Sequence, residues 1–304
     1  WNSLLLAGLT AAGAVALGFM GAAGALALPA RWQSRLAAAA VVVLVLPPFL
    51  NVNAWLQLLE TGSPWARWWP LPLRSVLGTA FILVLQAWPL GYLACLAAWR
   101  GLESWQLEGE THLAGLGLAR WLLWPMARPY LGLAAVIVVA LSLSNFSVPA
   151  ILQVKVLPPE LWVRFNTTLK PADALLAGWP LLAVPLLLLP LVWTRAIPWP
   201  RLEHAFPEAL LRQGTRGGLA VCGGGVRAVL LGLSLALPLL QLTLSWRTWL
   251  ELPVVWQAVP RAIWNSGVLG ALAALGCFLA ALATWRFRAG ALAWILFLVA
   301  GTLL

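Results

Sequence analysis

Charged residues are scarce in this chain. Of its 304 residues only 9% are Asp, Glu, Lys or Arg, while 62% are hydrophobic, and the mean hydropathy is +0.90. Soluble domains are about one quarter charged. The composition therefore excludes an ordinary soluble domain and predicts a polytopic membrane protein.

The apolar residues form eight runs, and a helix needs about 20 residues to cross about 30 Å of hydrocarbon. The runs cover residues 2–28, 37–59, 75–99, 130–152, 176–194, 228–244, 264–284 and 290–304. We therefore expect an all-α fold with about eight transmembrane helices. The first residue is Trp1 and the last run is short, so we also expect the chain to be a fragment of a longer protein.

None of the eight runs contains Asp, Glu, Lys, Arg or His. Ion-coupled transporters generally need such groups at membrane depth. Their absence argues against a proton-driven transporter, although a sodium site built from carbonyls and hydroxyls would not need them. No Ser/His/Asp arrangement or Asp pair is present, and His112 and His204 lie between runs. We expect no enzyme activity in this chain.

Motifs for metals and nucleotides are also lacking. Cys95, Cys222 and Cys277 are scattered without a CxxC, which favours a packing role over a metal site or a disulfide. No Gly-x-x-x-x-Gly-Lys-Ser/Thr occurs, and "CGGGVR" at 222–227 lacks both the lysine and a preceding strand. We therefore expect no bound metal, cofactor or ATP.

The basic residues divide unevenly between alternate loops. Twelve lie on one side: Arg31, Arg35, Arg100, Arg120, Arg128, Arg195, Arg201, Arg212, Arg216, Arg227, Arg286 and Arg288. The other seven are Arg67, Arg74, Lys155, Arg164, Lys170, Arg247 and Arg261. The positive-inside tendency places the first side in the cytoplasm. Because the charge lies in loops, the net charge of +10 does not indicate nucleic-acid binding.

Tryptophan is abundant, with 21 residues. Nine of them lie at predicted span ends: Trp65, Trp68, Trp69, Trp99, Trp121, Trp124, Trp246, Trp249 and Trp285. An amphipathic ring suits the headgroup region, so we interpret these residues as an interface belt.

The chain contains an internal repeat. "WNSLLLAGLTAA" at 1–12 is matched by "WNSGVLGALAAL" at 264–275, and both begin a Gly/Ala-rich apolar run. A duplication predicts a first half over 1–195 with five spans, a cytoplasmic linker over 196–227 rich in Arg, Gly and Pro, and the start of a second half over 228–304.

Uncharged polar residues lie within the predicted spans, close to prolines. They are Asn51, Asn53, Gln57, Gln86, Ser144 and Asn145. A polar group in hydrocarbon costs free energy unless it is paired or hydrated. Two interpretations stay open, and they are compatible: hydrogen bonds between helices, or a water-accessible translocation path lined by weakly polar groups.

The polar stretch "LEGETHLAGLGLARWLLWPMARP" (107–129) separates two apolar runs. It resembles the cytoplasmic loop of permease subunits of bacterial binding-protein-dependent ABC importers. In that family Glu-Ala-Ala is followed by three residues, a glycine and a run ending near Leu-Pro. Here 109–111 replace Glu-Ala-Ala, and Gly115 lies closer to Pro125 than in the family's pattern.

Three further segments are similar to the iron(III)/thiamine type of these permeases. They are "VLVLPPFLNVNAWLQLL" (43–59), "AAWRGLESWQLEGETHLAGLG" (97–117) and the segment 143–182 that begins "LSNFSVPAILQ". The resemblance implies a duplicated type I importer permease fold in the bacterial inner membrane. It also implies two partners: cytoplasmic ABC ATPase subunits and an extracytoplasmic solute-binding protein.

The resemblance assigns roles to two loops. The loop at about 103–129 would couple to the ATPase through Glu108, Glu110, Leu113, Ala114, Gly115, Pro125 and Arg128. The loop at 153–174 on the other side would dock the solute-binding protein through Lys155, Glu160, Arg164 and Lys170. Each loop is also compatible with an ordinary solvated loop.

The leading hypothesis is therefore the membrane permease of an ATP-driven importer for iron(III), thiamine or another small solute. Two alternatives remain: a secondary transporter or channel that does not use ATP, and a membrane scaffold that transports nothing.

Overall fold

In the computed structural model the described residues are 1–59, 67, 69, 72–102, 114–168, 176–181, 183–184, 186–188 and 208–287. Within these ranges the elements are helices and no strand occurs, so the all-α prediction is confirmed. The chain forms two compact units, Trp1–Pro238 and Leu239–Leu304.

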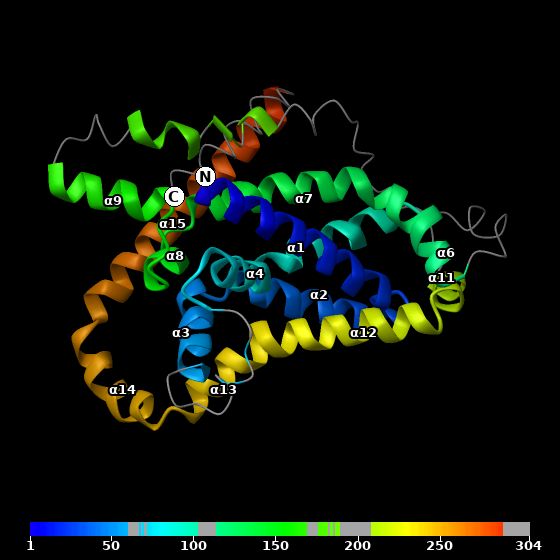
Figure 1. Ribbon diagram of the computed structural model, residues 1–304, viewed down its shortest axis with the longest axis horizontal. Helices are drawn as coiled ribbons and strands as arrows, with labels where there is room; N and C mark the ends of the chain where they lie inside the picture. Colours follow the sequence, from blue (N-terminus) through cyan, green and yellow to red (C-terminus); the bar gives the residue numbers. More distant parts are fainter. Residues whose placement is uncertain are drawn as a thin grey trace. The chain divides into compact units, whose positions relative to one another are not determined.

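Unit 1 holds most of the described helices (Figure 1). They are α1 (Asn2–Ala25), α2 (Ala30–Val45), α3 (Pro48–Leu58), α4 (Val76–Trp99), α6 (Leu116–Leu118), the π-helical η2 (Ala119–Leu123), α7 (Trp124–Ser144), α8 (Ser147–Ile151), α9 (Leu157–Thr168), α11 (Glu208–Gly214), α12 (Gly218–Leu231), the π-helical η3 (Gly232–Ala236) and the start of α13 (Leu237–Leu244).

Four helices of the described part are long and apolar enough to cross a membrane. They are Asn2–Ala25, Val76–Trp99, Leu116–Ser144 and Gly218–Leu244, and the bent pair α2 and α3 makes a fifth if it is one span. The chain is therefore a polytopic membrane protein by the length and composition of its helices.

Three of the eight predicted spans remain predictions. The run at 176–194 falls partly on a shorter apolar helix, Leu176–Leu188. The run at 264–284 lies within α15 (Pro260–Phe287), and the run at 290–304 lies outside the described residues.

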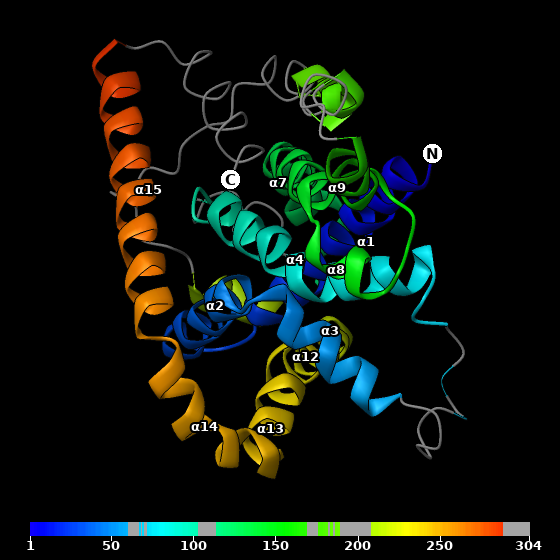
Figure 2. The same cartoon turned by 90° about the vertical axis from the view of Figure 1, so that its left-hand side faces the viewer.

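α1 is the central helix of unit 1 and packs against α4, α7 and α12 (Figures 1 and 2). Glycines allow the close approach. A Cβ on Gly18 would lie 2.6 Å from the backbone nitrogen of Tyr92, and one on Gly24 would lie 2.5 Å from the carbonyl carbon of Gly223. Small residues at helix contacts are what membrane bundles use, because lipid supplies no hydrophobic drive between helices.

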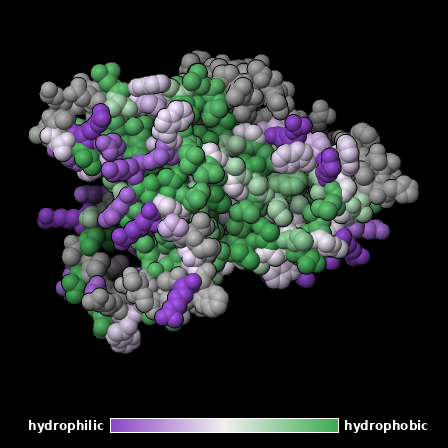
Figure 3. Space-filling model, viewed as in Figure 1, coloured by the Kyte–Doolittle hydropathy of each residue, from purple (hydrophilic) through white to green (hydrophobic). Residues whose placement is uncertain are grey.

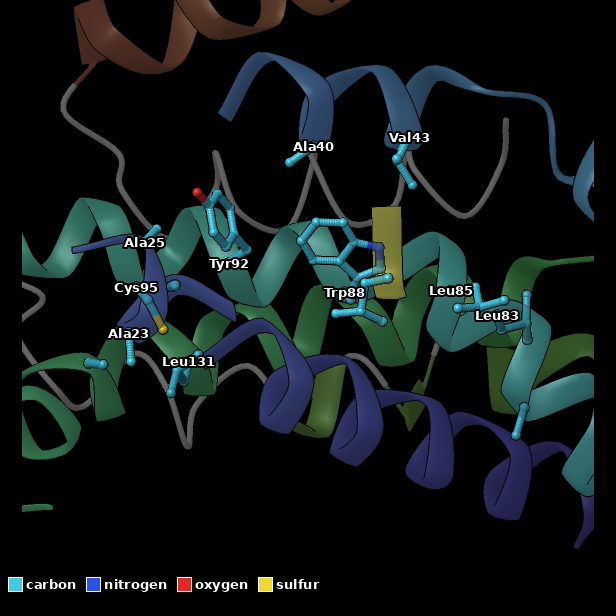
Figure 4. Close-up of a cluster of buried hydrophobic side chains, with 14 of the residues drawn as sticks. Ala23, Ala25, Ala40, Val43, Leu83, Leu85, Trp88, Tyr92, Cys95 and Leu131 are labelled. Atoms are coloured by element: carbon cyan, nitrogen blue, oxygen red, sulfur yellow. The ribbon is translucent and has the colours of Figure 1, made fainter. Parts of the chain in front are cut away.

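Large side chains of α4 fill the space beside these contacts. Figure 4 shows Trp88 and Tyr92 rising from α4 toward Ala40 and Val43 of α2. All four side chains are buried. Bulky residues of α4 and small residues of α1 and α2 thus make complementary surfaces.

Pro47 and Pro48 lie at an 87° bend between α2 and α3. Proline has no N–H, so a break leaves backbone carbonyls without helical partners. The side-chain amide of Gln86 on α4 donates to the Leu46 carbonyl at 3.2 Å. A neighbouring helix therefore compensates the break.

Two helices begin earlier than the hydropathy of the sequence predicted. The span expected from 130 starts at Leu116, and the span expected from 228 starts at Gly218. A π turn, η2, precedes Pro125 and accommodates the missing N–H of this residue within a continuous helix. Arg227 consequently lies inside a helix rather than in a loop, so the prediction that no span holds an ionisable residue was wrong here.

Unit 2 contains the whole of α14 (Trp246–Ala258) and α15 (Pro260–Phe287), together with the last residues of α13. The indole N–H of Trp249 donates to the Thr243 carbonyl at 2.8 Å. The second Trp-Asn-Ser box, 264–266, lies in the second turn of α15. The proposed duplication and its boundaries at 195 and 227 stay predictions.

Candidate functional site

The described part of the predicted coupling loop begins at Ala114. Gly115 has φ +56°, in the left-handed region that favours glycine, and begins the helix that continues into α7. Its N–H donates to the Gly214 carbonyl at the end of α11, at 2.8 Å. Glu108, Glu110 and Leu113 lie outside the described residues.

The helix after Gly115 is longer than a membrane span requires. Leu116–Ser144 contains 29 residues, which is about 44 Å at 1.5 Å per residue, against about 30 Å of hydrocarbon. Roughly its first ten residues can therefore extend beyond the membrane. In Figure 3 hydrophilic side chains gather at the right-hand end, where α6 and α11 lie.

One side of this extension is exposed and carries both arginine and tryptophan. We call Arg120, Trp121, Trp124, Pro125 and Arg128 the Arg–Trp stripe; all five are exposed, Trp121 by 67% and Trp124 by 40%. The Arg120 guanidinium lies 5.4 Å from the centroid of the Trp121 ring. Arginine and tryptophan are the residues that most often anchor protein interfaces.

The extension is also fixed to the bundle, by one hydrogen bond and by aromatic contacts that include Trp124 of the stripe. The Trp99 indole N–H donates to the Leu123 carbonyl at 3.0 Å. Phe19 of α1 packs edge-on against Trp99, with centroids 5.8 Å apart, and against Trp124, at 5.2 Å. Trp99 is fully buried, so its assignment to an interface belt was wrong. The part of the helix that carries the stripe is thus in direct contact with α1 and α4.

The predicted path residues do not form one cluster. Gln86 bridges to the α2–α3 break, Ser144 donates to the Ala140 carbonyl at 3.0 Å, and Asn145 accepts from the Val148 N–H at 3.0 Å. Asn53 and Gln57 share an exposed face of α3. Their role in a translocation path stays a prediction.

Asn51 differs from these residues. It is buried, and its Oδ1 has no hydrogen-bond partner within the described chain. The indole N–H groups of Trp55 and Trp69 are buried and unpartnered as well. The rings of Trp55, Trp69 and Phe81 pack against one another in tilted and edge-to-face contacts, with centroids 4.9 to 5.3 Å apart. Buried polar groups are normally satisfied, so this corner of α3 is suited to hold water or polar solute atoms.

The predicted docking loop lies at the opposite end of unit 1. Lys155, Glu160 and Arg164 are all exposed, and Lys170 lies outside the described residues. Trp162 on α9 is 56% exposed. The Asn2 amide donates to the Lys155 carbonyl at 3.1 Å, and Ser3 Oγ accepts from the Leu157 N–H at 2.8 Å, which fixes this segment to the start of α1.

Arg227 and Tyr92 are two buried polar residues that were not predicted as site residues. Arg227 on α12 is 8% exposed, and Tyr92 on α4 is fully buried. The signal for Arg227 was an arginine ten residues into the apolar run 218–244, hidden because the glycines at 223–225 were interpreted as a linker.

Comparisons of the chain with protein-family models, with curated proteins and with solved structures find no match. The Arg–Trp stripe, the bent pair α2 and α3, and the α9 end are therefore the features from which a function can be inferred.

Proposed function

We propose that this chain is the membrane permease subunit of an ATP-driven importer, and that the Arg–Trp stripe binds a cytoplasmic ATPase subunit. The substrate would be a small solute such as iron(III) or thiamine, as the resemblance of 107–129 to importer permeases implies. The chain would supply the path, and the partner would supply the energy.

The observation that carries the proposal is the position of the stripe. It lies on a helix that extends beyond the span, with large aromatic and cationic side chains exposed on one side. The adjacent Leu123 carbonyl is hydrogen-bonded to α4, and Trp124 of the stripe itself packs against Phe19 of α1. A partner that moves the stripe therefore moves two membrane helices with it.

Charge supports the cytoplasmic placement of the stripe. The described arginines at the end of unit 1 where α1 and α4 end and α12 begins are Arg31, Arg35, Arg100, Arg120, Arg128, Arg212, Arg216 and Arg227. We call this the arginine-rich end. Positive residues favour the cytoplasmic side of a membrane, where an ATPase has access to ATP.

The opposite end fits a solute-binding protein. α9 presents Trp162, Glu160 and Arg164 on its exposed surface. The α2–α3 bend with Asn51 offers uncharged polar groups for a translocation path. Such groups select weakly among solutes, so much of the selectivity would reside in the protein that delivers the solute.

Two matched substitutions test the proposal. The chain, as wild type, Trp121→Glu and Trp162→Glu, is co-expressed with a candidate ABC ATPase subunit and a candidate solute-binding protein. Both tryptophans are more than half exposed, so neither change alters the core. We expect Trp121→Glu to lower ATPase recovery at least tenfold, which corresponds to about 1.4 kcal/mol, and to leave the binding protein attached. Trp162→Glu should do the reverse.

Equal loss of both partners from either variant would point to unfolding, which thermal melting of the purified chain detects. Recovery of the ATPase with Trp121→Glu at the wild-type level would remove the stripe from the interface. If no ATPase is recovered with the wild type, the chain acts without one, as a secondary transporter, channel or scaffold would.

A further inference from the structure

Arg227 is a buried cation at the junction of three helices. Its side chain crosses from α12 to α1, where NH1 donates to the Gly21 carbonyl at 3.1 Å. A Cβ on Gly21 would lie 3.7 Å from the Arg227 Cβ and 3.8 Å from the Tyr92 ring. Arg227 and Tyr92 therefore lie against the same point of α1.

The polar capacity of this junction is only partly used. A guanidinium has five N–H donors, and one hydrogen bond is described for Arg227. The Tyr92 hydroxyl is buried and has no partner among the described residues. No carboxylate of the described residues pairs with Arg227. A buried cation without a counter-charge is costly.

The junction lies near the end of α1 that belongs to the arginine-rich end. Gly21 lies four residues before the end of α1 at Ala25, or about 6 Å along the axis. α1 has 24 residues and is about 36 Å long, so about 3 Å of each end passes the edge of about 30 Å of hydrocarbon and Gly21 lies within about 3 Å of that edge. The junction belongs to the arginine-rich end.

We infer that Arg227 and Tyr92 bind the phosphate of an anionic phospholipid between α1, α4 and α12. The phosphate oxygens would accept from the free guanidinium N–H groups and from the Tyr92 hydroxyl. Arginine suits phosphate because its planar fork donates two parallel hydrogen bonds. Basic pockets between helices on the cytoplasmic side are sites where anionic headgroups bind. The site is independent of the transport proposal, because it needs neither partner protein.

The test measures lipid binding to the purified, delipidated full chain by native mass spectrometry. The probes are phosphatidylglycerol, phosphatidylcholine and inorganic phosphate. Arg227→Gln removes the buried charge, and Tyr92→Phe removes only the hydroxyl. Arg216→Gln is the matched control, since Arg216 is exposed at the same end of unit 1.

We expect Arg227→Gln to weaken phosphatidylglycerol binding about fivefold, as expected for one basic residue near an anionic membrane surface. Tyr92→Phe should weaken it about twofold, the lower range for one hydrogen bond. Arg216→Gln should change it less than Arg227→Gln does. Phosphatidylcholine should bind more weakly than phosphatidylglycerol, and excess inorganic phosphate should not displace the lipid.

Two outcomes would overturn the inference. If Arg227→Gln binds phosphatidylglycerol as tightly as wild type does, Arg227 has no role in lipid binding. Its role would then be limited to the hydrogen bond with the Gly21 carbonyl of α1. Displacement of the lipid by inorganic phosphate would assign the site to free phosphate. If Arg227→Gln does not fold, Tyr92→Phe decides alone, because its loss of a hydroxyl leaves the packing of the ring intact.

Discussion

α1 and α15 both carry the sequence Trp-Asn-Ser at or near their starts, yet the two helices have different surroundings. α1 is in contact with α4, α7 and α12 along most of its length. The described side chains of α15 are exposed almost throughout. The residues of α15 equivalent to the buried face of α1 are small as well, for instance Gly270, Ala273 and Ala274. The pattern of small residues thus marks a face suited to contact, and the neighbouring helices decide whether contact is made.

The glycines show the contrast most clearly. Gly18 and Gly24 of α1 touch the backbone of another helix, whereas Gly270 and Gly276 of α15 have nothing within 4 Å of a Cβ. The same residue type is essential for packing in one helix and unconstrained in the other. Paired substitutions in the two helices test this difference.

The largest effect is expected for Gly24→Leu. Its side chain would meet the backbone at Gly223, so α1 and α12 must separate. We expect a loss of about 3 kcal/mol or more, the upper range for overpacking. Thermal unfolding in detergent measures it, and Gly270→Leu in α15 should leave the melting temperature unchanged. If Gly24→Leu and Gly270→Leu have the same melting temperature, the α1–α12 contact does not stabilise the protein.

Trp99→Phe should have the next largest effect. It keeps a ring beside Phe19 but removes the hydrogen bond to the Leu123 carbonyl. We expect a stability loss of about 1 kcal/mol and weaker ATPase recovery, because the stripe loses its link to α4. Trp264 is 73% exposed, so Trp264→Phe is the matched control. A normal ATPase yield from Trp99→Phe would argue against the link.

Gln86→Leu tests the polar compensation of the α2–α3 bend. The change leaves the Leu46 carbonyl without its described side-chain donor. Hydrogen bonds between membrane helices contribute about 0.6 kcal/mol on average, so the fall in melting temperature should be modest. Gln257 is exposed on α14 and serves as the control. Transport lost without any fall in stability would instead favour a path role for Gln86.

The smallest effect on stability is expected at the Trp-Asn-Ser sequences themselves, residues 1–3 and 264–266. Ser3→Ala removes the acceptor for the Leu157 N–H, which should cost about 0.5 kcal/mol. Ser266→Ala, in the exposed box of α15, should cost nothing measurable. Hydrogen exchange at the Leu157 amide separates the two: faster exchange is expected in Ser3→Ala alone, and unaltered exchange there would mean that the bond adds no protection.

Hydropathy predicted much of this fold, and the misses have physical reasons. The start of α12 was missed because three consecutive glycines, 223–225, suggest flexibility in water, whereas in the bundle Gly223 lies directly against the backbone of α1. The burial of Trp99 was missed because a tryptophan at a span end suits both a lipid interface and helix packing. The position of Gly115 at the start of a helix and its bond to Gly214 were not predictable, since nearly a hundred residues separate the two glycines.

The most direct measurement of the central claim is ATP turnover in proteoliposomes. A candidate ABC ATPase subunit is reconstituted with and without the chain, as wild type and as Trp121→Glu. We predict that wild type raises ATP turnover when the solute-binding protein and its solute are present, and that Trp121→Glu abolishes the increase. Turnover that is the same with wild type, with the variant and without the chain would contradict the proposal that this protein is driven by ATP through the Arg–Trp stripe.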